Sequence, residues 1–564
     1  MQIRKIGVVS RTYRHINRYR QILTIFFKFG FGDLVDRLHV GQYLEIGRRM
    51  ISIGRRERLE KLNRSERVRM AVEELGPTFI KLAQVLSTRP DLIPAEFAQE
   101  FSKLQDQVPS FPFSKVREIV TAELKAPLEE KFPYFEETSL AAASIGQVHR
   151  ARLQSGEEVV VKVQRPGIRQ TIEVDLEILL HLATLIERHV EELGIHRPTR
   201  IVEEFARTLG KEVDYTVEAY HTERFARQFI GNPTIYVPRI YREATTERIL
   251  TMEYIPGIKA SEVAALDQQG FDRKIIASRG ADLILEQVFL HGFFHADPHP
   301  ANVFLLPGNV ICYLDYGMMG SVDRQARENF AELVYGYVCR DESKIAQALL
   351  KIVEWDTEPD RRALEKDISD FTTMYLYHPL KELKIDPIAK ALLGLITRHR
   401  LRLPPDIFLM IKALTIAEGV GVALDPDLDM AEKAAPFIKR IKLARLHPRR
   451  IIGEFLDSGG DFVQLLKEIP GEMSDILKQV KRGKVKIGFE HQGLEGFAFH
   501  IDRSSNRIAF SLLISSLIIG SSLIIRTDIG PYLFGLPILG LLGFTIAGIF
   551  GVWLLISILR SGRL

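Results

Sequence analysis

A lysine in an apolar stretch of this sequence could bind phosphate. Lys162 lies in the run Glu158–Val163, which has the composition of a strand. Alternate residues of a strand share a face, so Lys162 is expected to point opposite Val161 and Val163. Two interpretations are open for such a lysine. It is either an ordinary edge-strand residue or a ligand for phosphate groups, as in the V-A-I-K strand.

Two aspartates and an asparagine farther along have the spacing that phosphoryl transfer needs. Asp297 and Asn302 are five residues apart, and Asp315 follows a short predicted hairpin. The pattern H-R-D-x-x-x-x-N, hairpin, D-F-G has these intervals. Its asparagine and second aspartate hold Mg²⁺, and its first aspartate orients the nucleophile. Two residues depart from the pattern, because Ala296 replaces arginine and Tyr316 replaces phenylalanine.

Two other interpretations of this stretch remain open. His291, His295, Asp297 and His299 are closely spaced residues of metal-ligand type, which could indicate a transition-metal site. Neighbouring prolines, however, break any helix that would align them, and no further Cys/His cluster supports such a site. The other alternative is a polar loop whose histidines are satisfied by ordinary hydrogen bonds.

A glycine-rich phosphate loop is expected before the lysine strand, but alanines stand there. Glycines let backbone amides approach phosphates closely. Alanines keep these amides but add methyl groups, so nucleotide binding is expected to persist with a changed geometry at the γ-phosphate. Taken alone, a run of alanines is also typical of a helix interior. The residues of the turn are Ala141, Ala142, Ala143 and Ser144.

The elements around these motifs predict two lobes with a cleft between them. Strands with a few helices come first, and a mainly helical half follows to about residue 479. The helical patterns cover 66–86, 94–104, 114–124, 170–193, 200–229 and 281–291, and the strands cover 147–153, 158–163, 235–241, 248–254, 303–306 and 310–314.

Composition excludes several classes of protein. The 564 residues carry 76 Lys+Arg and 72 Asp+Glu, a net charge of only +4, so the molecule is not a general nucleic-acid binder. Two cysteines, Cys312 and Cys339, exclude a disulfide scaffold and a multi-cysteine metal site. The first 70 residues are strongly basic. This start is either a transit peptide or a retained basic helix on anionic lipid or protein, and the continuous helical pattern favours the helix.

The C-terminal region predicts a transmembrane helical hairpin. Two stretches near the end of the sequence contain no charged residue, Ile508–Ile525 and Tyr532–Leu559. Each has about the length that a helix needs to cross a bilayer. Arginines flank both ends of the pair, which by the positive-inside rule places the ends and the preceding domain in the cytoplasm. The alternative is a buried helical hairpin in a soluble core. The flanking arginines are Arg503, Arg507, Arg560 and Arg563.

Together, these motifs resemble the UbiB family of atypical, protein-kinase-like proteins, and the resemblance covers nearly the whole chain. It implies an α+β, two-lobed protein-kinase-like fold with an N-terminal helical extension and a C-terminal transmembrane helical hairpin. The motifs are Leu75–Gln84, Ala141–Ser144, Val161–Lys162, Glu212–Asp214, His295–Asp297, Asn302 and Asp315–Gly317. The implied domains are basic helices (1–70), a helical extension covering the cleft (71–130), the N-lobe with an inserted helix (131–260), a helical C-lobe (261–490) and two transmembrane helices (505–560).

The resemblance implies a role for each residue of the phosphate site. Lys162 would contact the α- and β-phosphates of ATP, and Glu218 would be its ion-pair partner. Asp297 would be the catalytic-loop aspartate. Asn302 and Asp315 would hold Mg²⁺. Ala141 to Ser144 would cover the nucleotide.

Further residues match smaller motifs of the family. Glu253 and Tyr254 would lie in the hinge beside the adenine. Glu212 and Asp214 match the E-x-D signature. On one continuous helix Glu212 and Glu218 would lie about 240° apart, so only one of them could face the lysine, and Glu218 is preferred.

Lys81 and Gln84 match the K-x-G-Q motif, with Ala83 where the family has glycine. Three residues apart, Lys81 and Gln84 share one face of a helix. In the family this helix covers the cleft and takes the place of a peptide substrate. Without the resemblance, the two residues would indicate an exposed helix face.

The resemblance implies a membrane protein that binds ATP and Mg²⁺ and supports isoprenoid-quinone biosynthesis, typically of ubiquinone. The implied partners are the lipid bilayer and quinone precursors or quinone-biosynthesis proteins, not nucleic acid, and a homodimer is compatible with them. The implied location is the bacterial inner membrane, with the kinase-like domain in the cytoplasm. Three activities remain open: a lipid-coupled ATPase or small-molecule kinase, a true protein kinase, and a non-catalytic lipid-binding chaperone switched by nucleotide.

Overall fold

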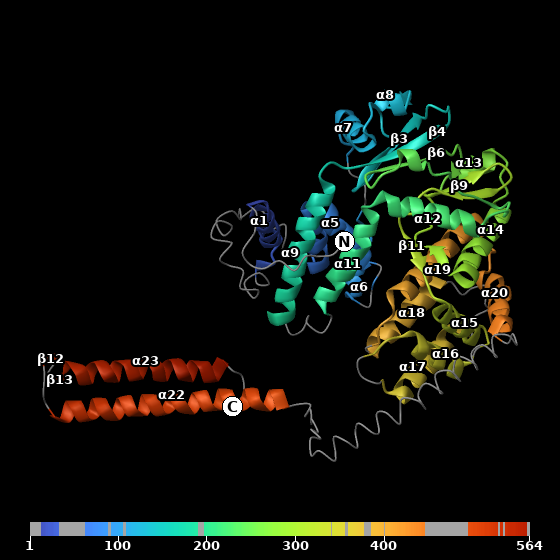
Figure 1. Ribbon diagram of the computed structural model, residues 1–564. Coiled ribbons are helices and arrows are strands. Elements are labelled where there is room, and N and C mark those ends of the chain that lie inside the picture. The colour runs from blue at the N-terminus through green and yellow to red at the C-terminus, as the bar shows by residue number, and fades with distance from the viewer. Residues whose placement is uncertain are drawn as a thin grey trace, which may run out of the picture. The chain divides into compact units, whose positions relative to one another are not determined.

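The computed structural model contains two compact units, one within Met1–Ile451 and one within Ile452–Leu564 (Figure 1). The expectations for the basic start and for the helical stretch after residue 445 lie mostly outside the residues that the structure describes. The described residues are 13–32, 62–87, 89, 92–104, 109–189, 197–339, 341–355, 359–376, 385–399, 401–445, 494–527, 531–533 and 536–560.

A five-stranded antiparallel sheet forms the small lobe of the first unit. Its strand order is β1-β3-β4-β6, and β2 pairs with β3. Val159, Val161 and Val163 of β4 are fully buried in the core shared with helix α7, and Lys162 lies on the opposite face, as predicted. The elements are α7 (Phe113–Leu124), α8 (Leu128–Lys131), β1 (Tyr134–Phe135), β2 (Ala141–Ala142), β3 (Gly146–Arg152), β4 (Glu158–Gln164) and β6 (Ile249–Glu253).

The long helix predicted over 200–229 is wrong, because the chain breaks into two helices. Helix α11 (Pro198–Glu212) ends before Val213, and α12 (Tyr215–Gln228) begins after Asp214. Asp214 caps α12 by accepting a hydrogen bond from the Thr216 amide at 2.9 Å. The insertion after the lysine strand therefore contains two helices, α9 (Ile168–His189) and α11, rather than one.

A layer of helices forms the N-terminal extension of this unit. Its helices share one hydrophobic core with α9 and α11, and Figure 1 shows α5 beside these two. Gly76, with φ +96°, interrupts the helix predicted over 66–86 and separates α4 from α5, which begins at Pro77. The apolar face of α1 is buried in this core, so α1 packs on protein. The helices are α1 (Tyr13–Lys28), α4 (Arg64–Leu75), α5 and α6 (Ala95–Phe101), with α5 spanning Pro77–Ser87.

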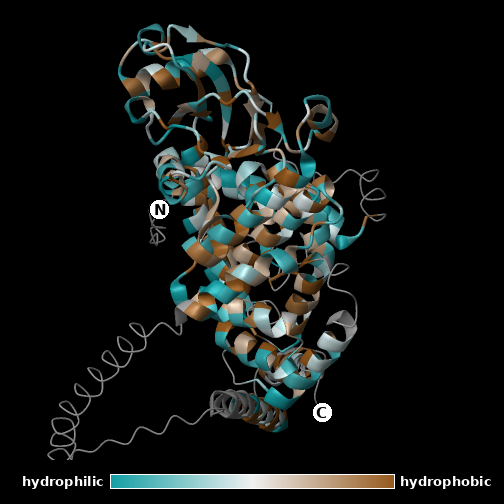
Figure 2. Ribbon diagram, turned by 90° about the vertical axis from the view of Figure 1, so that its right-hand side faces the viewer, coloured by the Kyte–Doolittle hydropathy of each residue, from teal (hydrophilic) through white to brown (hydrophobic). Residues whose placement is uncertain are grey.

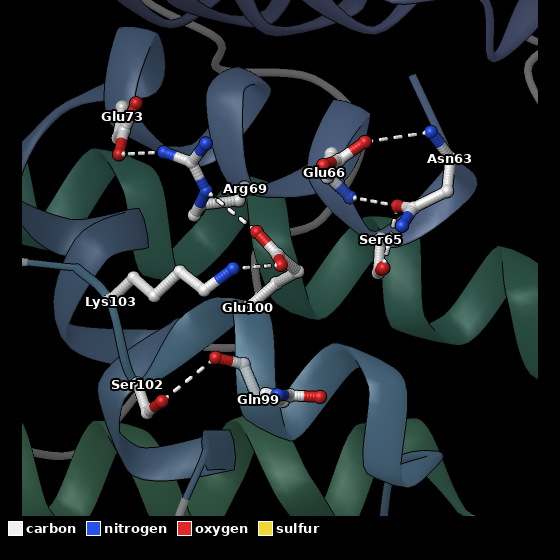
Figure 3. A network of polar contacts seen from close by, with 9 residues as sticks. All are labelled: Asn63, Ser65, Glu66, Arg69, Glu73, Gln99, Glu100, Ser102 and Lys103. Atoms are coloured by element: carbon white, nitrogen blue, oxygen red, sulfur yellow. Dashed lines mark hydrogen bonds and ion pairs between the residues drawn. The ribbon is translucent and has the colours of Figure 1, made fainter. Parts of the chain in front are cut away.

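Polar contacts fix α4 at its start and against α6 (Figure 3). Asn63 accepts a hydrogen bond from the Glu66 amide, and Glu66 accepts one from the Asn63 amide, which forms a capping box. Arg69 lies between Glu73 of its own helix and Glu100 of α6, at 2.6 and 3.1 Å. The extension is therefore held by both apolar and ionic contacts.

The large lobe is a bundle of helices around one core, and Figure 2 shows that these helices carry both hydrophobic and hydrophilic residues. A small sheet-bearing lobe and this larger helical lobe confirm the predicted two-lobed α+β organisation. The helices are α13 (Val263–Gln268), α14 (Arg273–Leu285), a π-helical turn (Glu286–His291), α15 (Arg324–Val338), α16 (Glu342–Ile352), α17 (Arg361–Leu376), α18 (Ile385–Arg398), α19 (Pro405–Leu424) and α20 (Met430–Arg445).

Short strands at the top of the large lobe position its functional loop. The hairpin predicted around Gly308 and Asn309 is confirmed as β9 and β10, and both turn residues have positive φ. Strand β8 precedes this hairpin in the sequence and strand β11 follows it. The two strands pair antiparallel with each other. The strands are β5 (Ile235–Tyr236), β7 (Ile258–Lys259), β8 (Phe293–His295), β9 (Val303–Leu306), β10 (Val310–Tyr313) and β11 (Met319–Ser321).

Helix α19 is long and apolar enough to cross a membrane, but it belongs to the core of the large lobe. Half of its most apolar stretch is buried inside the protein. It also carries Glu418, whose carboxylate accepts a hydrogen bond from the Ile385 amide at 2.6 Å. A helix with these contacts is packed in protein rather than in lipid.

The second unit is a pair of helices that lie side by side, α22 (Leu494–Thr527) and α23 (Ile538–Arg560) (Figure 1). Their apolar segments Ser505–Thr527 and Ile538–Leu555 are only 6% and 11% buried. This exposure contradicts the alternative of a hairpin buried in a soluble core and makes the pair membrane-associated. Two short strands pair at the turn, β12 (Tyr532–Leu533) and β13 (Leu536–Pro537).

A buried ion pair ties α1 to the extension and provides a test of this packing. Arg18 donates to both carboxylate oxygens of Asp175 at 2.7 and 3.0 Å and to the Leu75 carbonyl at 2.6 Å, and the Asp175 side chain is 1% exposed. We expect Arg18→Met to lower the free energy of unfolding by about 3 kcal/mol, because it leaves a buried carboxylate unpaired. Thermal unfolding of the purified protein measures the loss.

The matched control is Arg20→Met, which removes an exposed arginine from the same helix. We expect it to change the free energy of unfolding by less than about 0.5 kcal/mol. Equal stability of the Arg18 and Arg20 variants would contradict the structural role of the ion pair.

Candidate active site

A buried ion pair between strand β4 and helix α12 forms the centre of the site. Lys162 of β4 donates to both carboxylate oxygens of Glu218 on α12, at 2.9 and 3.1 Å. Their side chains are 23% and 5% exposed. The break before Tyr215 sets the rotation of α12, so the expected 240° argument no longer applies. Glu218 nonetheless faces the lysine.

Tyr215 and Asp315 complete the surroundings of Lys162. The ammonium lies 5.2 Å from the centre of the fully buried Tyr215 ring. Burial lowers the pKa of Lys162, but the attraction of Glu218 and then of Asp315 outweighs it and raises this pKa well above its ordinary value. Lys162 in turn lowers the pKa of Asp315.

The charges of this centre do not balance. Glu218 and Asp315 are two carboxylates beside one ammonium, that of Lys162. Burial raises the pKa of Glu218 to about 7, against the opposing attraction of Lys162. An excess of negative charge in a buried place favours the uptake of a cation.

Asp315 is held in place by the backbone on both sides of it. One carboxylate oxygen accepts a hydrogen bond from the Gly317 amide at 2.9 Å, and the Asp315 carbonyl contacts His295 Nε2 at 2.5 Å. Tyr316, at the position of the missing phenylalanine, is fully buried, with its ring 5.2 Å from that of Phe225 on α12. Burial of this ring directs Asp315 to the opposite side, toward Lys162.

Backbone hydrogen bonds bring the other two loop residues to the same region. The Leu314 amide donates to the Asn302 carbonyl at 3.0 Å, which places Asn302 beside the strand that leads to Asp315. The Ala296 amide donates to the Met318 carbonyl at 3.0 Å, one residue before Asp297. The Asp297 carboxylate is partly exposed.

Asp297 faces a lysine that the sequence did not single out. The ammonium of Lys412 on α19 lies 3.7 Å from its carboxylate. Helix α19 packs against β8 and β11, the strands that come before and after Asp297 in the sequence. Lys412 lies 95 residues beyond Gly317, the end of the last motif, so only the fold reveals it.

The alanine turn is a tight hairpin rather than part of a helix. Ala141 and Ala142 form β2, which pairs with β3, and the Ala143 amide donates to the Gly146 carbonyl at 2.8 Å. The Ser144 side chain is buried, and its hydroxyl has no hydrogen-bond partner among the described residues. The turn is therefore a compact loop above the end of the lysine strand.

Gly146 is required here by close packing. A Cβ atom at this position would lie 2.6 Å from the Val163 carbonyl oxygen and would overlap the Tyr215 hydroxyl. The sequence shows a glycine at this position but gives no reason for it, because Val163 and Tyr215 reach it only in the folded lobe.

The side chains of the expected hinge are engaged in structural contacts. The Glu253 carboxylate accepts hydrogen bonds from the Tyr236 hydroxyl at 2.8 Å and from the Arg239 amide at 3.1 Å. The Tyr254 ring lies 4.5 Å from the guanidinium of Arg150, which shares the Lys162 face of the sheet. Because the Glu253 side chain is engaged in this way, a contact from Glu253 to a nucleotide base would come from its backbone.

Helix α5 places its motif beside the centre. Lys81 forms an ion pair with Glu212, the last residue of α11, at 2.7 Å. Its charge also contributes, after that of Lys162, to lowering the pKa of Asp315. Gln84 donates to the Leu104 carbonyl at 3.4 Å, within the extension. Ala83, which replaces the family's glycine, is buried in the core of the extension.

The E-x-D signature divides into two separate tasks. Glu212 neutralises Lys81 of α5, whereas Asp214 caps α12 and thereby fixes the start of the helix that carries Glu218. Both residues act on the centre through other groups.

The alternative of a transition-metal site is not supported. His291 contacts Glu286 at 3.3 Å, and His295 contacts the Asp315 backbone. In the part of the chain that the structure describes, no group of three or more His, Cys, Asp or Glu residues is arranged to hold a metal ion.

Sequence comparisons give the family of the chain. The profile of the ABC1 atypical kinase-like domain matches residues 103–349, that of the UbiB helical domain matches 368–429, and that of the ABC1/UbiB kinase-like C-terminal domain matches 492–560. A probable protein kinase UbiB of Aeromonas hydrophila is 34% identical over 477 residues, which are 83% of this chain and 87% of that protein. The chain belongs to the UbiB family of atypical kinase-like proteins.

The chain is also similar to a second protein and to a solved structure. An uncharacterised protein encoded in the hydrogenase 1 5' region of Clostridium pasteurianum is 32% identical over 553 residues, 97% of this chain and all of that protein. A solved structure, the complex of Rv3197 with erythromycin from Mycobacterium tuberculosis, covers 67% of this chain and 96% of that one at 22% identity and a TM-score of 0.46. The assignment rests on the sequence matches alone.

The centre of this UbiB-family protein fits a magnesium–nucleotide complex. Asn302 and Asp315 would supply the oxygen atoms that Mg²⁺ prefers, because Mg²⁺ commonly takes only one or two protein carboxylates and fills its shell with phosphate oxygens and water. Lys162 would supply a cation for the phosphates. Because the described residues contain no larger acidic cluster, the remaining ligands would come from the nucleotide.

The packing around Gly146 gives a test of the site. We expect Gly146→Ala to lower the free energy of unfolding by about 1–3 kcal/mol, because the methyl group would overlap Tyr215 and the Val163 carbonyl. Adding Tyr215→Phe should recover part of the loss, since it removes the overlapping hydroxyl. Thermal unfolding measures both variants.

The matched control is Gly394→Ala in α18, where an added Cβ meets open space. We expect this helix substitution to be neutral or to stabilise the protein slightly. A Gly146 variant as stable as the Gly394 variant would contradict the close approach.

Proposed function

We propose that this protein is a membrane-anchored, Mg–ATP-dependent kinase-like ATPase or small-molecule phosphotransferase that supports isoprenoid-quinone biosynthesis. The convergence of Lys162, Glu218 and Asp315 on one buried centre carries the proposal. A relative of this chain is named probable protein kinase UbiB, which supports a kinase-like activity.

The chemistry proposed for the centre follows from its charges. Lys162 would neutralise the α- and β-phosphates, and Glu218 would hold its ammonium in place. Asn302 and Asp315 would bind Mg²⁺, which supplies positive charge for the transferred phosphoryl group. Asp297 would orient the attacking water or hydroxyl, with the Lys412 ammonium 3.7 Å from its carboxylate.

The covering helix α5 supports a substrate other than a protein. Lys81 pairs with Glu212 and its charge acts on Asp315, so the two side chains would take the space where an incoming peptide would approach. Two departures from the protein-kinase pattern also argue against a protein substrate. Ala296 replaces the arginine of the H-R-D motif, and alanines replace the glycine-rich loop that positions the γ-phosphate in ordinary kinases. Hydrolysis, or transfer to a small or lipid molecule, fits this arrangement better.

The membrane hairpin supports coupling to lipid. Isoprenoid-quinone precursors are long apolar molecules that reside in the bilayer, where α22 and α23 expose their side chains. The UbiB-family resemblance links such anchored proteins to quinone synthesis. We therefore propose that ATP turnover is coupled to making quinone precursors accessible at the bacterial inner membrane.

Asp315→Asn tests catalysis. It keeps the shape of the side chain but removes the charge that would hold Mg²⁺, so we expect Mg²⁺-dependent ATP turnover of the purified protein to fall by about 100-fold or more. Quinone content of a strain that depends on this gene should fall with it. Asp386→Asn, at an exposed residue paired with Lys390, is the matched control and should leave both unchanged.

Three outcomes separate the remaining activities. Loss of turnover together with loss of quinone supports the proposal. Loss of turnover with normal quinone content would sink it and favour a non-catalytic, nucleotide-switched chaperone. Transfer of phosphate to added proteins at a rate that exceeds phosphate release would favour a true protein kinase.

Thiol labelling tests the cytoplasmic location of the kinase-like domain. Cys339 is exposed and Cys312 is buried. In cells whose outer membrane is permeabilised, we expect a membrane-impermeant maleimide to leave Cys339 unlabelled until the inner membrane is opened. The matched control is Thr527→Cys with Cys339→Ser, which places an exposed thiol at the hairpin turn and should react from outside. Labelling of Cys339 in sealed cells would contradict the location.

A further inference from the structure

Three consecutive residues that lead into the small lobe contact both ends of the alanine loop. The entry segment, Pro109–Phe111, follows the helical extension and precedes α7. The alanine loop is Ala141–Gly146, the proposed cover of the nucleotide. Ser110 and Phe111 contact residues that border this loop, and Pro109 is joined to the loop through Arg165.

The first contact is made by Gln147, directly after the loop. Its side-chain oxygen accepts a hydrogen bond from the Phe111 amide at 2.9 Å, and its side-chain nitrogen donates to the Phe111 carbonyl at 3.2 Å. Gln147 is 1% exposed, and its nitrogen also contacts His149 Nε2 at 2.9 Å. The side-chain amide of Gln147 thus pairs with both backbone polar groups of Phe111, as a neighbouring strand would. This pairing is buried in the protein interior.

The second contact lies before the loop. The hydroxyl groups of Ser110 and Ser139 are 2.8 Å apart, and Ser139 comes two residues ahead of Ala141. The entry segment therefore touches the chain on both sides of the alanine loop.

Arg165 joins the entry segment to the middle of the loop. Its Nη2 atom donates to the Pro109 carbonyl at 2.9 Å and to the Ala143 carbonyl at 3.4 Å. Its guanidinium lies 5.5 Å from the centre of the Phe111 ring, and its own amide donates to the Ile145 carbonyl at 2.7 Å. A planar guanidinium can bind two acceptors at once in a fixed geometry, which lysine cannot reproduce.

The same extension also reaches the opposite side of the centre. Lys81 of α5 pairs with Glu212 at the end of α11, and Gln84 contacts Leu104, the last described residue before the gap that precedes Pro109. The extension is thus connected to the alanine loop through one set of contacts and to the helices behind Lys162 through another.

We propose that Arg165 and Gln147 are positioning residues that fasten the alanine loop to the entry segment, so that the helical extension sets the position of the loop and hence the affinity for nucleotide. The part of this inference that concerns affinity rests on the proposed function. The fastening itself is a property of the nucleotide-free protein and can be measured without it.

Arg165→Gln tests the fastening in the full-length protein in detergent micelles. Losing two hydrogen bonds and the contact with Phe111 should speed amide hydrogen exchange within residues 139–147 about tenfold and raise the Kd of a non-hydrolysable ATP analogue about tenfold. The matched control is Arg152→Gln, at an exposed arginine of β3 that pairs with Glu158 and does not touch the entry segment. Exchange and affinity equal to those of the control would overturn the proposal.

A cross-link separates positioning from simple destabilisation. Because the Ser110 and Ser139 hydroxyls are 2.8 Å apart, Ser110→Cys with Ser139→Cys can form a disulfide there, in a Cys339→Ser background. Added to Arg165→Gln, the oxidised cross-link should restore slow exchange and most of the affinity, and reduction should abolish the rescue. An oxidised triple variant as weak as its reduced form would overturn the proposal.

The two readouts keep this proposal distinct from the proposed function. If the wild-type protein binds no ATP analogue, the proposed function fails. Hydrogen exchange within residues 139–147 of Arg165→Gln then still decides whether the entry segment fastens the loop.

Discussion

The whole centre depends on one buried attraction, that between the Lys162 ammonium and the Glu218 carboxylate. Two charges can be buried only when each satisfies the other, because loss of either partner leaves the remaining charge without water or a counterion. Their distance of 2.9 Å requires that β4 keep its alternation and that α12 start at one defined residue. Asp214 fixes that start, and Val163 and its neighbours fix the strand. Much of the small lobe therefore serves to hold these two side chains in register.

The N-terminal extension adds a second constraint on the same centre. It contributes a cation to the end of α11, and it leads into the small lobe through a segment packed against the alanine loop. A helix layer with these two attachments is part of the site rather than a covering added to it. The basic helix α1 belongs to this layer as well, because Arg18 joins it to Asp175 and to the end of α4. Of the two surfaces expected for this basic helix, anionic lipid or protein, its apolar face is bound to protein.

Local patterns predicted much of this molecule. Alternating valines identified the lysine strand and its buried face, and the Gly308–Asn309 turn identified the hairpin that leads to Asp315. The break between Glu212 and Glu218 was not predictable in this way, because no glycine or proline marks it and a capping aspartate also occurs within helices. Tyr215, Lys412 and the need for Gly146 were missed for a different reason. Each acts through a contact with a distant part of the chain, and no short stretch of sequence records such a contact.

The burial of α19 decides whether the number of membrane crossings is odd or even. Counted by apolarity alone, the chain would cross three times, and its last helix would end on the side opposite to the one where the first crossing began. With α19 folded into the large lobe, two crossings remain among the described residues, and an even number returns the chain to its starting side. Arg560 and the start of α22 then face the same aqueous compartment, so a fusion appended after α23 would report on the compartment in which α22 begins.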